Sequence, residues 1–366
     1  MRSSANTAVA RTPWKNTLQR SWLTRGPLAT LLWPVSLLYR ALIALRRQFY
    51  RWGVFKVHQV DALVLVVGNV IAGGAGKTPT AIAIVQHLTQ NHLAVGVISR
   101  GYGRSSRACR EVHAHDLPHD VGDEPLLLKR ATQVPVFVGT TRLEAAQALL
   151  AHYPHTGIIV CDDGLQHYAL HRDLEICVFD DRGCGNHWLL PAGPLRETWP
   201  RQTVGKAGQH NGRLLVLHTG SRAAFAGFRA QRSLGLHGQR RDGSTVALSA
   251  LTTRPASNGS LPLLAVAGIA QPDNFFSMLR GLHLPLQQTL ALPDHYDFDS
   301  FSRSIYEGYQ LICTEKDAAK LWQIDPTALA VPLIFNIEPA FFAALDKGIH
   351  EQLAAKLSST HGHQIT

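Results

Sequence analysis

A short glycine-rich stretch that ends in Gly-Lys-Thr is the part of this sequence best suited to chemistry. Its members are Ile71, Ala72, Gly73, Gly74, Ala75, Gly76, Lys77 and Thr78. Backbone amides in such a turn surround phosphate oxygens, the lysine reaches the β- and γ-phosphates, and the threonine hydroxyl can bind Mg²⁺. The pattern predicts a P-loop that binds ATP together with Mg²⁺.

The predicted P-loop departs from the generic pattern at one position. The pattern G-x-x-x-x-G-K-[ST] begins with a glycine, and this chain has Ile71 there. The alternative interpretation is a glycine-rich turn that holds no ligand. A buried strand before the turn and an amphipathic helix after it favour nucleotide binding.

Two pairs of acidic residues offer metal ligands and a general base. Asp162 and Asp163 follow the apolar run 158–161, and in P-loop proteins a carboxylate at the end of a neighbouring strand helps to hold Mg²⁺. Asp162 is the first choice for that role, Asp163 and Glu124 are further candidates, and a turn-forming aspartate pair is the alternative. Asp123 precedes an apolar run and is expected to be a helix N-cap, which would also place a carboxylate near the phosphates.

Basic and aromatic side chains follow another apolar run. Arg100, Tyr102 and Arg104 lie in a glycine-containing loop directly after the strand expected at 93–98. Two arginines on such a loop can hold phosphate oxygens in a bidentate manner. A solvated basic loop is the alternative.

The elements expected around these residues alternate between strand and helix. The run 62–67 is apolar and rich in β-branched residues, as in a central parallel strand, and the helix after the P-loop has its apolar positions on one face. Further strands are expected at 93–98, 134–138, 157–161 and 174–179, with helices near 124–130 and 142–152. This alternation predicts an α/β fold of the P-loop NTPase type, with a mostly parallel sheet and helices on both faces. Ligands should gather at the carboxyl ends of the strands.

The pattern breaks in a proline-rich stretch at 191–200. Beyond it, strands are expected at 214–218, 263–267, 311–313 and 331–335, which predicts a second, smaller α/β domain. The sequence divides into a basic N-terminal extension (1–26), an amphipathic membrane-associating helix (27–55), a P-loop core domain (56–204) and a C-terminal α/β domain contributing to the active-site cleft (205–366).

Composition limits the classes of protein and partner. With 366 residues and 45% hydrophobic content, the chain can bury a sizeable core. A net charge of +10 favours an anionic partner: nucleic acid, acidic lipid or a phosphorylated substrate. The basic residues are not interleaved with aromatic residues, which argues against nucleic acid, and no protein partner is evident. Five scattered cysteines without a C-x-x-C pair indicate a reducing compartment.

One N-terminal segment has the pattern of a membrane-surface helix. The uncharged run 27–39 is shorter than the ~20 residues that a spanning helix needs. Extended as a helix, the region separates an apolar face from a basic polar face, as an interfacial helix on an anionic leaflet requires. The apolar face holds Leu31, Val35, Leu38, Leu42, Leu45 and Phe49, and the polar face holds Ser36, Arg40, Arg47 and Arg51. An ordinary amphipathic helix packed on the core stays an equal alternative.

Taken together, these stretches resemble the tetraacyldisaccharide 4'-kinase family, the lipid A 4'-kinases. The matching segments, in the family's order, are 67–69 with 73–79, 99–103, 122–125, 162–167, 190–197, 267–270, 294–295 and 314–317. The family's P-loop also lacks the first glycine, so Ile71 agrees with the resemblance, although threonine is more usual there. The segment before residue 25, the C-terminal tail and the region 221–260 match weakly or not at all.

The resemblance implies a reaction, a location and two catalytic roles. The γ-phosphoryl group of ATP would pass to the 4'-hydroxyl of tetraacyldisaccharide 1-phosphate in lipid A biosynthesis, at the cytoplasmic face of the bacterial inner membrane. Asp123 would be the base that receives the hydroxyl proton, with His295 from the second domain as its partner. Gln166, His167 and Arg196 are weaker candidates for contacts with the lipid or the nucleotide.

The main competing hypothesis is a P-loop ATPase that cycles on and off the membrane as a switch without a lipid acceptor. Such a protein has no use for an acceptor site. A nucleic-acid-dependent ATPase is suggested by the charge alone.

Overall fold

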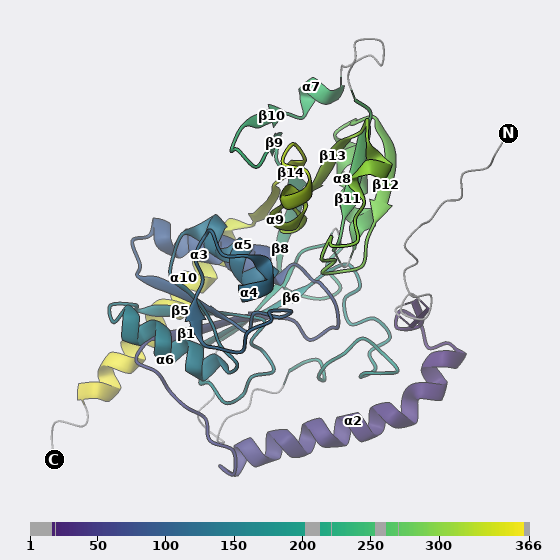
Figure 1. Ribbon diagram of the computed structural model, residues 1–366. Helices are drawn as coiled ribbons and strands as arrows, with labels where there is room; N and C mark the ends of the chain where they lie inside the picture. The colour runs from purple at the N-terminus through teal and green to yellow at the C-terminus, as the bar shows by residue number, and fades with distance from the viewer. Residues whose placement is uncertain are drawn as a thin grey trace. The chain divides into compact units, whose positions relative to one another are not determined.

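The computed structural model describes residues 17–18, 20–201, 213–220, 222–252, 261–269 and 271–361. Most of the predicted extension 1–26 lies outside the described residues, as do Ala270 and the tail 362–366. The chain forms two compact units (Figure 1). Unit 1 comprises Met1–Ser36, Leu190–Pro194 and Ser233–Ile334, and unit 2 comprises Leu37–Leu189, Leu195–Arg232 and Phe335–Thr366.

A nine-stranded sheet is the framework of unit 2, in the order β15-β8-β7-β6-β1-β5-β2-β4-β3. Its strands are β1 (Leu63–Gly68), β2 (Val95–Ser99), β3 (Arg110–Glu111), β4 (Val136–Val138), β5 (Ile158–Asp162), β6 (Leu174–Phe179), β7 (Arg213–His218), β8 (Phe228–Leu234) and β15 (Leu333–Ile337). The central strand β1 is parallel to both β5 and β6, and all residues of these three strands are buried. The predicted mostly parallel α/β sheet is therefore confirmed.

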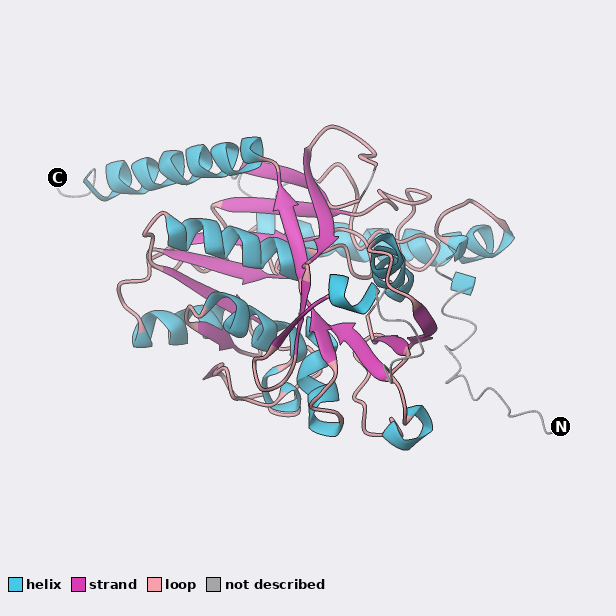
Figure 2. Ribbon diagram, turned by 90° about the horizontal axis from the view of Figure 1, so that it is seen from above, coloured by secondary structure: helices cyan, strands magenta, loops and turns pink. Residues whose placement is uncertain are grey.

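The helices of unit 2 flank this sheet (Figure 2). They are α3 (Lys77–Gln90), α4 (Pro118–Val121), α5 (Asp123–Thr132), α6 (Arg142–His152) and α10 (Pro339–His361). Helix α3 contacts β1 and β5, α6 contacts β2 and β4, and α10 contacts β7 and β1. The buried positions of α3 include Ala81, Ile84, Val85 and Leu88, which is the apolar face that the sequence predicts.

Unit 1 contains a six-stranded sheet in the order β10-β9-β14-β13-β11-β12. Its elements are β9 (His237–Gln239), β10 (Thr245–Ala247), α7 (Ser249–Thr252), β11 (Leu263–Ala267), α8 (Pro272–Gly281), β12 (Leu286–Ala291), η2 (Arg303–Tyr306), β13 (Gln310–Thr314), α9 (Glu315–Ile324) and β14 (Leu329–Val331). Strand β11 sends alternate residues into two hydrophobic cores, Ala265 into one and Val266 into the other. The second, smaller α/β unit is thus present.

The units divide the chain differently from the predicted boundary at residue 205, which lies outside the described residues. Strand β7 pairs in parallel with β6 along its whole length and so extends the sheet of unit 2. The chain returns to unit 2 at Phe335, because β15 joins the nine-stranded sheet and α10 packs on it. The strand expected at 331–335 is in fact two strands in different sheets.

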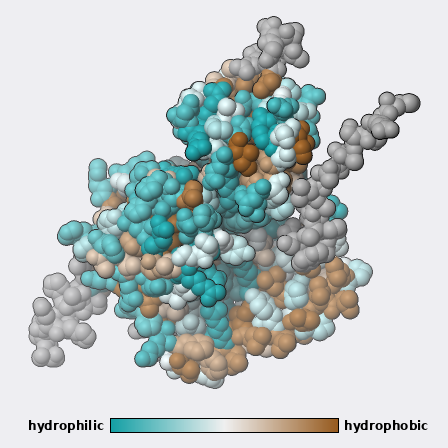
Figure 3. Space-filling view, in the orientation of Figure 1, coloured by the Kyte–Doolittle hydropathy of each residue, from teal (hydrophilic) through white to brown (hydrophobic). Residues whose placement is uncertain are grey.

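Helix α2 (Pro27–Arg51) extends well beyond the uncharged run 27–39, and its apolar face is exposed. Leu31, Val35, Leu38, Leu42 and Leu45 are all exposed, Leu31 to 76%. Brown, hydrophobic residues accordingly gather along the segment that Figure 1 labels α2 (Figure 3). At 25 residues the helix is long and apolar enough to cross a membrane by length and composition, although the uncharged run 27–39 alone is too short.

Two residues predicted on the polar face of α2 contact protein instead of solvent. Ser36 is buried, and its Oγ accepts a hydrogen bond from the Ala192 amide at 3.0 Å. Arg47 pairs with the buried carboxylate of Glu197 at 2.6 Å. The polar face therefore holds the helix on the chain and leaves the apolar face outside, so the exposed leucines argue against an ordinary core-packed helix.

Candidate active site

The glycine-rich turn between β1 and α3 has the backbone that a P-loop needs. Gly73 and Gly76 have φ angles of 96° and 86°, in the left-handed region that favours glycine. The side chain of Asn69 donates to the Gly73 carbonyl at 3.1 Å and closes the turn. Ile71 is fully buried and pairs with Leu195 in an isolated antiparallel bridge. An apolar residue therefore suits this position, where the generic pattern has glycine.

Contacts from outside the turn hold its carbonyl groups. Arg182 donates to the Ala72 carbonyl at 3.1 Å and is itself fixed by Asp180. Thr219 donates to the Ala75 carbonyl at 2.9 Å, and Arg232 donates to the Thr219 hydroxyl. Sequence analysis did not identify these residues, because single polar side chains far along the chain carry no motif.

Strand β5 brings Asp162 beside the P-loop. Val67 of β1 is the register partner of Asp162, so the carboxylate lies at the carboxyl end of the neighbouring strand, as predicted. Asp162 is 1% exposed, and neither of its carboxylate oxygens has a hydrogen-bond partner in the described part of the chain. Burial, together with the nearby carboxylates of Glu124 and Asp163, raises the pKa of Asp162 to about 8.

The next residue, Asp163, has a different environment. Its carboxylate lies 3.7 Å from the Lys77 ammonium and 3.3 Å from a guanidinium nitrogen of Arg196. Partial burial alone would raise its pKa, but Lys77 and Arg196 outweigh burial and hold the pKa of Asp163 below its ordinary value. Asp163 is thus a stable anion that fixes the P-loop lysine.

The residues around Asp162 fit a divalent cation. The raised pKa favours a protonated Asp162, and a cation beside its two unpaired, buried oxygens would stabilise the ionised form. Thr78 at the first turn of α3 is also buried. No group of three or more His, Cys, Asp or Glu side chains with metal-binding geometry occurs among the residues described. That agrees with a P-loop site, where one carboxylate and one hydroxyl hold Mg²⁺ together with phosphate oxygens and water.

Asp123 is the first residue of α5, and Gly122 before it is the N-cap, with a φ of 94°. The expectation of Asp123 as the N-cap is therefore wrong by one position. A Cβ at Gly122 would lie 3.0 Å from the Gly101 Cα, and a Cβ at Gly101 would lie 2.6 Å from the Val121 carbonyl. These close approaches pack the loop of Arg100 and Tyr102 against the start of α5.

The predicted substrate-contacting residues have distinct environments. Arg100 is exposed, and Tyr102 is 69% exposed on the same loop. Gln166 is partly buried and donates to the Asn69 carbonyl and to Glu197. Burial and the surrounding arginines lower the pKa of His167 to about 4, so its ring is neutral at pH 7.

Arg142 is a functional candidate that sequence analysis did not identify. Its buried guanidinium donates to the backbone carbonyls of Asp162 and Asp163 at 3.1 and 3.0 Å. Thr141 is the N-cap of α6, and its hydroxyl accepts from the Glu144 amide at 3.1 Å. A capping threonine indicates where α6 begins, but it does not indicate that Arg142, the next residue, reaches the backbone carbonyls of Asp162 and Asp163.

His295 belongs to unit 1, where its φ is 62° and its amide donates to the Gly268 carbonyl. Its ring Nε2 lies 3.3 Å from the Lys316 ammonium, which also contacts Asp294 at 3.2 Å. Thr314 is the N-cap of α9, and its hydroxyl accepts from the Asp317 amide.

Comparisons with known proteins agree on one family. The family model described as Tetraacyldisaccharide-1-P 4'-kinase matches residues 28–353. A protein of Polaromonas naphthalenivorans named tetraacyldisaccharide 4'-kinase is 51% identical over 96% of this chain and 100% of its own length. A protein of Leptothrix cholodnii with the same name is 41% identical over 90% of this chain and 94% of its own length. Among solved structures, the "apo" form of LpxK from Aquifex aeolicus in complex with ATP matches with a TM-score of 0.71 and 26% identity, over 89% of this chain and 99% of that one.

Proposed function

The chain belongs to the tetraacyldisaccharide-1-P 4'-kinase family, and we propose how its residues carry out that reaction. The enzyme transfers the γ-phosphoryl group of ATP to the 4'-hydroxyl of tetraacyldisaccharide 1-phosphate in lipid A biosynthesis. One observation carries the assignment of the site: the P-loop lies beside a buried carboxylate, Asp162, that has no hydrogen-bond partner among the described residues. A γ-phosphate and its metal ion would supply the charges that this arrangement needs.

Each P-loop group has a defined task in this proposal. The amides of 71–78 bind the phosphates, and Lys77, held by Asp163, reaches the β- and γ-phosphates. Thr78 and Asp162 would hold Mg²⁺, with Glu124 as a further ligand candidate. The ion would neutralise charge that develops on the phosphate oxygens.

Asp123 is the proposed general base for the 4'-hydroxyl. It starts α5, where Gly122 and Gly101 bring the loop of Arg100 close. A positioned base contributes ~10²- to 10⁴-fold to rate, so most of the acceleration falls to positioning and charge neutralisation. The role of His295 as partner of this base rests on the family resemblance and stays a prediction.

We also propose that the enzyme works at the cytoplasmic face of the bacterial inner membrane, on an anionic lipid surface. The exposed apolar face of α2 and the net charge of +10 support this location. Arg196, beside Asp163, and Arg100 are the proposed contacts for phosphates of the lipid or the nucleotide.

Transfer of label to lipid tests the function directly. The full chain is incubated with γ-labelled ATP, Mg²⁺ and tetraacyldisaccharide 1-phosphate in detergent micelles. We expect labelled lipid with the wild type and none with Lys77→Ala, because the variant loses the P-loop cation. Label that appears only as free phosphate would mean that the chain is a membrane-associated ATPase switch, and the proposed function would fail.

A further inference from the structure

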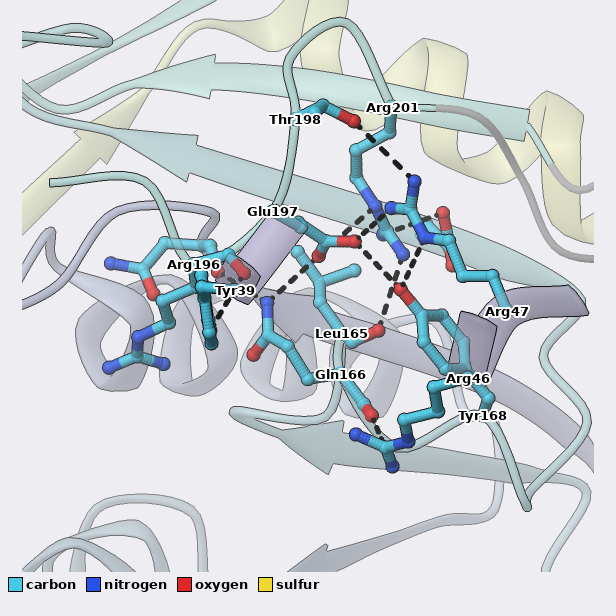
Figure 4. Close-up of polar contacts among 12 residues, drawn as sticks. Tyr39, Arg46, Arg47, Leu165, Gln166, Tyr168, Arg196, Glu197, Thr198 and Arg201 are labelled. Atoms are coloured by element: carbon cyan, nitrogen blue, oxygen red, sulfur yellow. Dashed lines mark hydrogen bonds and ion pairs between the residues drawn. The ribbon is translucent and has the colours of Figure 1, made fainter. Parts of the chain in front are cut away.

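A buried polar network leads from helix α2 toward the nucleotide site, and Figure 4 shows its part from Arg47 to Gln166. Arg47 of α2 donates to Glu197 at 2.6 Å and to the Tyr168 hydroxyl at 3.2 Å. Glu197 is 1% exposed, and Arg201, with its side chain equally buried, lies 3.4 Å from its other carboxylate oxygen. The network thus begins on the helix with the exposed apolar face and enters the interior of unit 2.

The network reaches the P-loop through two amide side chains. Gln166 donates to Glu197 at 2.9 Å and to the backbone carbonyl of Asn69 at 3.0 Å. The side chain of Asn69 donates in turn to the Gly73 carbonyl at 3.1 Å. Three side chains therefore separate Arg47 from the turn that binds the phosphates.

A second route leads from α2 to the P-loop lysine. The Tyr39 hydroxyl donates to the Arg196 carbonyl at 3.1 Å. The Arg196 guanidinium contacts Asp163 at 3.3 Å, and Asp163 contacts Lys77 at 3.7 Å. Both routes start on α2, and they end at two different positions of the phosphate-binding turn, Gly73 and Lys77.

The low exposure of this network makes it sensitive to the loss of a member. Burial alone would raise the pKa of Glu197, but Arg201, Tyr168 and Arg47 outweigh it and keep the carboxylate ionised, with a lowered pKa. If Arg47 is removed, Tyr168 at 2.8 Å, Gln166 at 2.9 Å and Arg201 must hold the buried charge alone, and Gln166 is the group among them that also holds the P-loop. A change at α2 is therefore passed to Gln166 and Asn69.

We infer that Arg47 and Tyr39 are positioning residues for the nucleotide site, so that α2 couples its seating on an anionic lipid surface to the order of the P-loop. All the residues of both routes belong to unit 2. The inference rests on the proposed function, because it takes ATP as the ligand of the P-loop. Linkage requires reciprocity: vesicles tighten ATP binding, and ATP tightens vesicle binding by the same factor.

The test compares two arginines of the same helix. Arg40 is exposed, whereas Arg47 holds Glu197. Arg40→Met and Arg47→Met remove the same charge from α2. The dissociation constant of Mg-ATP is measured on the full chain, with and without vesicles of phosphatidylcholine and phosphatidylglycerol. We expect vesicles to tighten ATP binding of the wild type and of Arg40→Met by about fivefold or more. For Arg47→Met we expect weaker ATP binding without vesicles and no gain with them.

Kinetics separate positioning from a general loss of stability. With Arg47→Met we expect the KM for ATP to rise while kcat at saturating ATP stays near the wild-type value. Arg47→Lys, which keeps the charge but not the planar fork, should restore part of the affinity. If Arg47→Met does not fold, Tyr39→Phe removes one hydroxyl and is expected to raise the KM for ATP through Arg196.

The outcomes are distinct. If folded Arg47→Met binds ATP as tightly as Arg40→Met, the inference is overturned and the kinase assignment stays intact. If Arg47→Met does not fold, a Tyr39→Phe variant with the same KM for ATP as the wild type has the same meaning. A wild-type chain that binds no ATP would overturn the proposed function, and this inference with it.

Discussion

Two adjacent carboxylates at the end of β5 have opposite properties. Asp162 is buried without a hydrogen-bond partner in the described part of the chain, and its pKa is raised, whereas Asp163 contacts Lys77 and Arg196 and its pKa is lowered. Strand β5 ends at Asp162, and Asp163 follows it with a left-handed φ of 46°. Because the chain turns there, one aspartate can enter the interior while the next meets the basic groups. The two aspartates therefore suit different roles: Asp162 can bind a metal ion, and Asp163 holds the P-loop lysine in place.

A residue-scale prediction concerns the proposed base. Asp123→Asn keeps the size of the side chain and the start of α5 but removes proton acceptance. We expect ATP binding close to that of the wild type and a kcat lowered about 10²- to 10⁴-fold at saturating substrate. Steady-state kinetics with the lipid acceptor, beside a nucleotide-binding titration, measure both quantities.

The matched control for this prediction is Asp120→Asn, a carboxylate in α4 three residues earlier, which pairs with His119. This variant should have a kcat within about twofold of the wild-type value, since surface substitutions away from buried or catalytic groups have small effects. An unchanged kcat in Asp123→Asn would remove Asp123 from the base role.

At the scale of elements, the sequence predicts best where one pattern decides the structure. Strands β1 and β11 are apolar, and β6 is apolar except for the buried Glu175. All three fall within a residue of their expected positions, because full burial demands such runs. Exposed positions alternate with buried or half-buried ones in strand β8, but Arg232 takes one of the inward positions, so the sequence indicates only short strand candidates there. No local pattern indicates the hydrogen bond from the Arg142 guanidinium to the Asp162 carbonyl, because the two residues are about twenty positions apart in the chain.

A second prediction concerns the attachment of β1 and α10 through Asp173. Its carboxylate accepts from the Val64 amide at 2.7 Å and from the Lys356 ammonium at 3.1 Å. Burial would raise the pKa of Asp173, but the contacts with His171, Val64 and Lys356 outweigh it and lower the pKa. A lowered folded-state pKa gives stability that is present above the unfolded pKa of about 3.9 and is lost as pH falls through the folded value.

We therefore expect Asp173→Asn to lower the free energy of unfolding by about 1–2 kcal/mol at pH 7, and the difference from the wild type to shrink below about pH 4. Urea unfolding as a function of pH measures it. Asp299→Asn, an exposed carboxylate in unit 1, serves as the control and should change stability by less than about 0.5 kcal/mol. A difference that is constant from pH 7 to pH 3 would show that the charge of Asp173 does not contribute.

At the scale of the whole molecule, charge and exposed apolar surface point to the same kind of partner. The chain has a net charge of +10, and α2 exposes leucines that most soluble proteins would bury. The substrate of the family is both acylated and phosphorylated, so an anionic lipid surface meets both features. Contacts through Glu197 and Gln166 connect the polar face of the same helix to the turn after β1. If α2 acts as we infer, the membrane would affect nucleotide binding as well as anchor the enzyme.

The last prediction tests that face against vesicles. Leu31, Leu38 and Leu42 are exposed, and each gains roughly 1 kcal/mol when lipid covers it, so changing all three to Gln should lower partitioning into anionic vesicles on the order of 100-fold. Leu236→Gln with Ile305→Gln removes exposed apolar side chains from unit 1 and should leave partitioning unchanged. Vesicle sedimentation at low and high salt separates the apolar contribution from the electrostatic one. Equal partitioning of the wild type and the triple variant would mean that something other than lipid covers the leucines of α2.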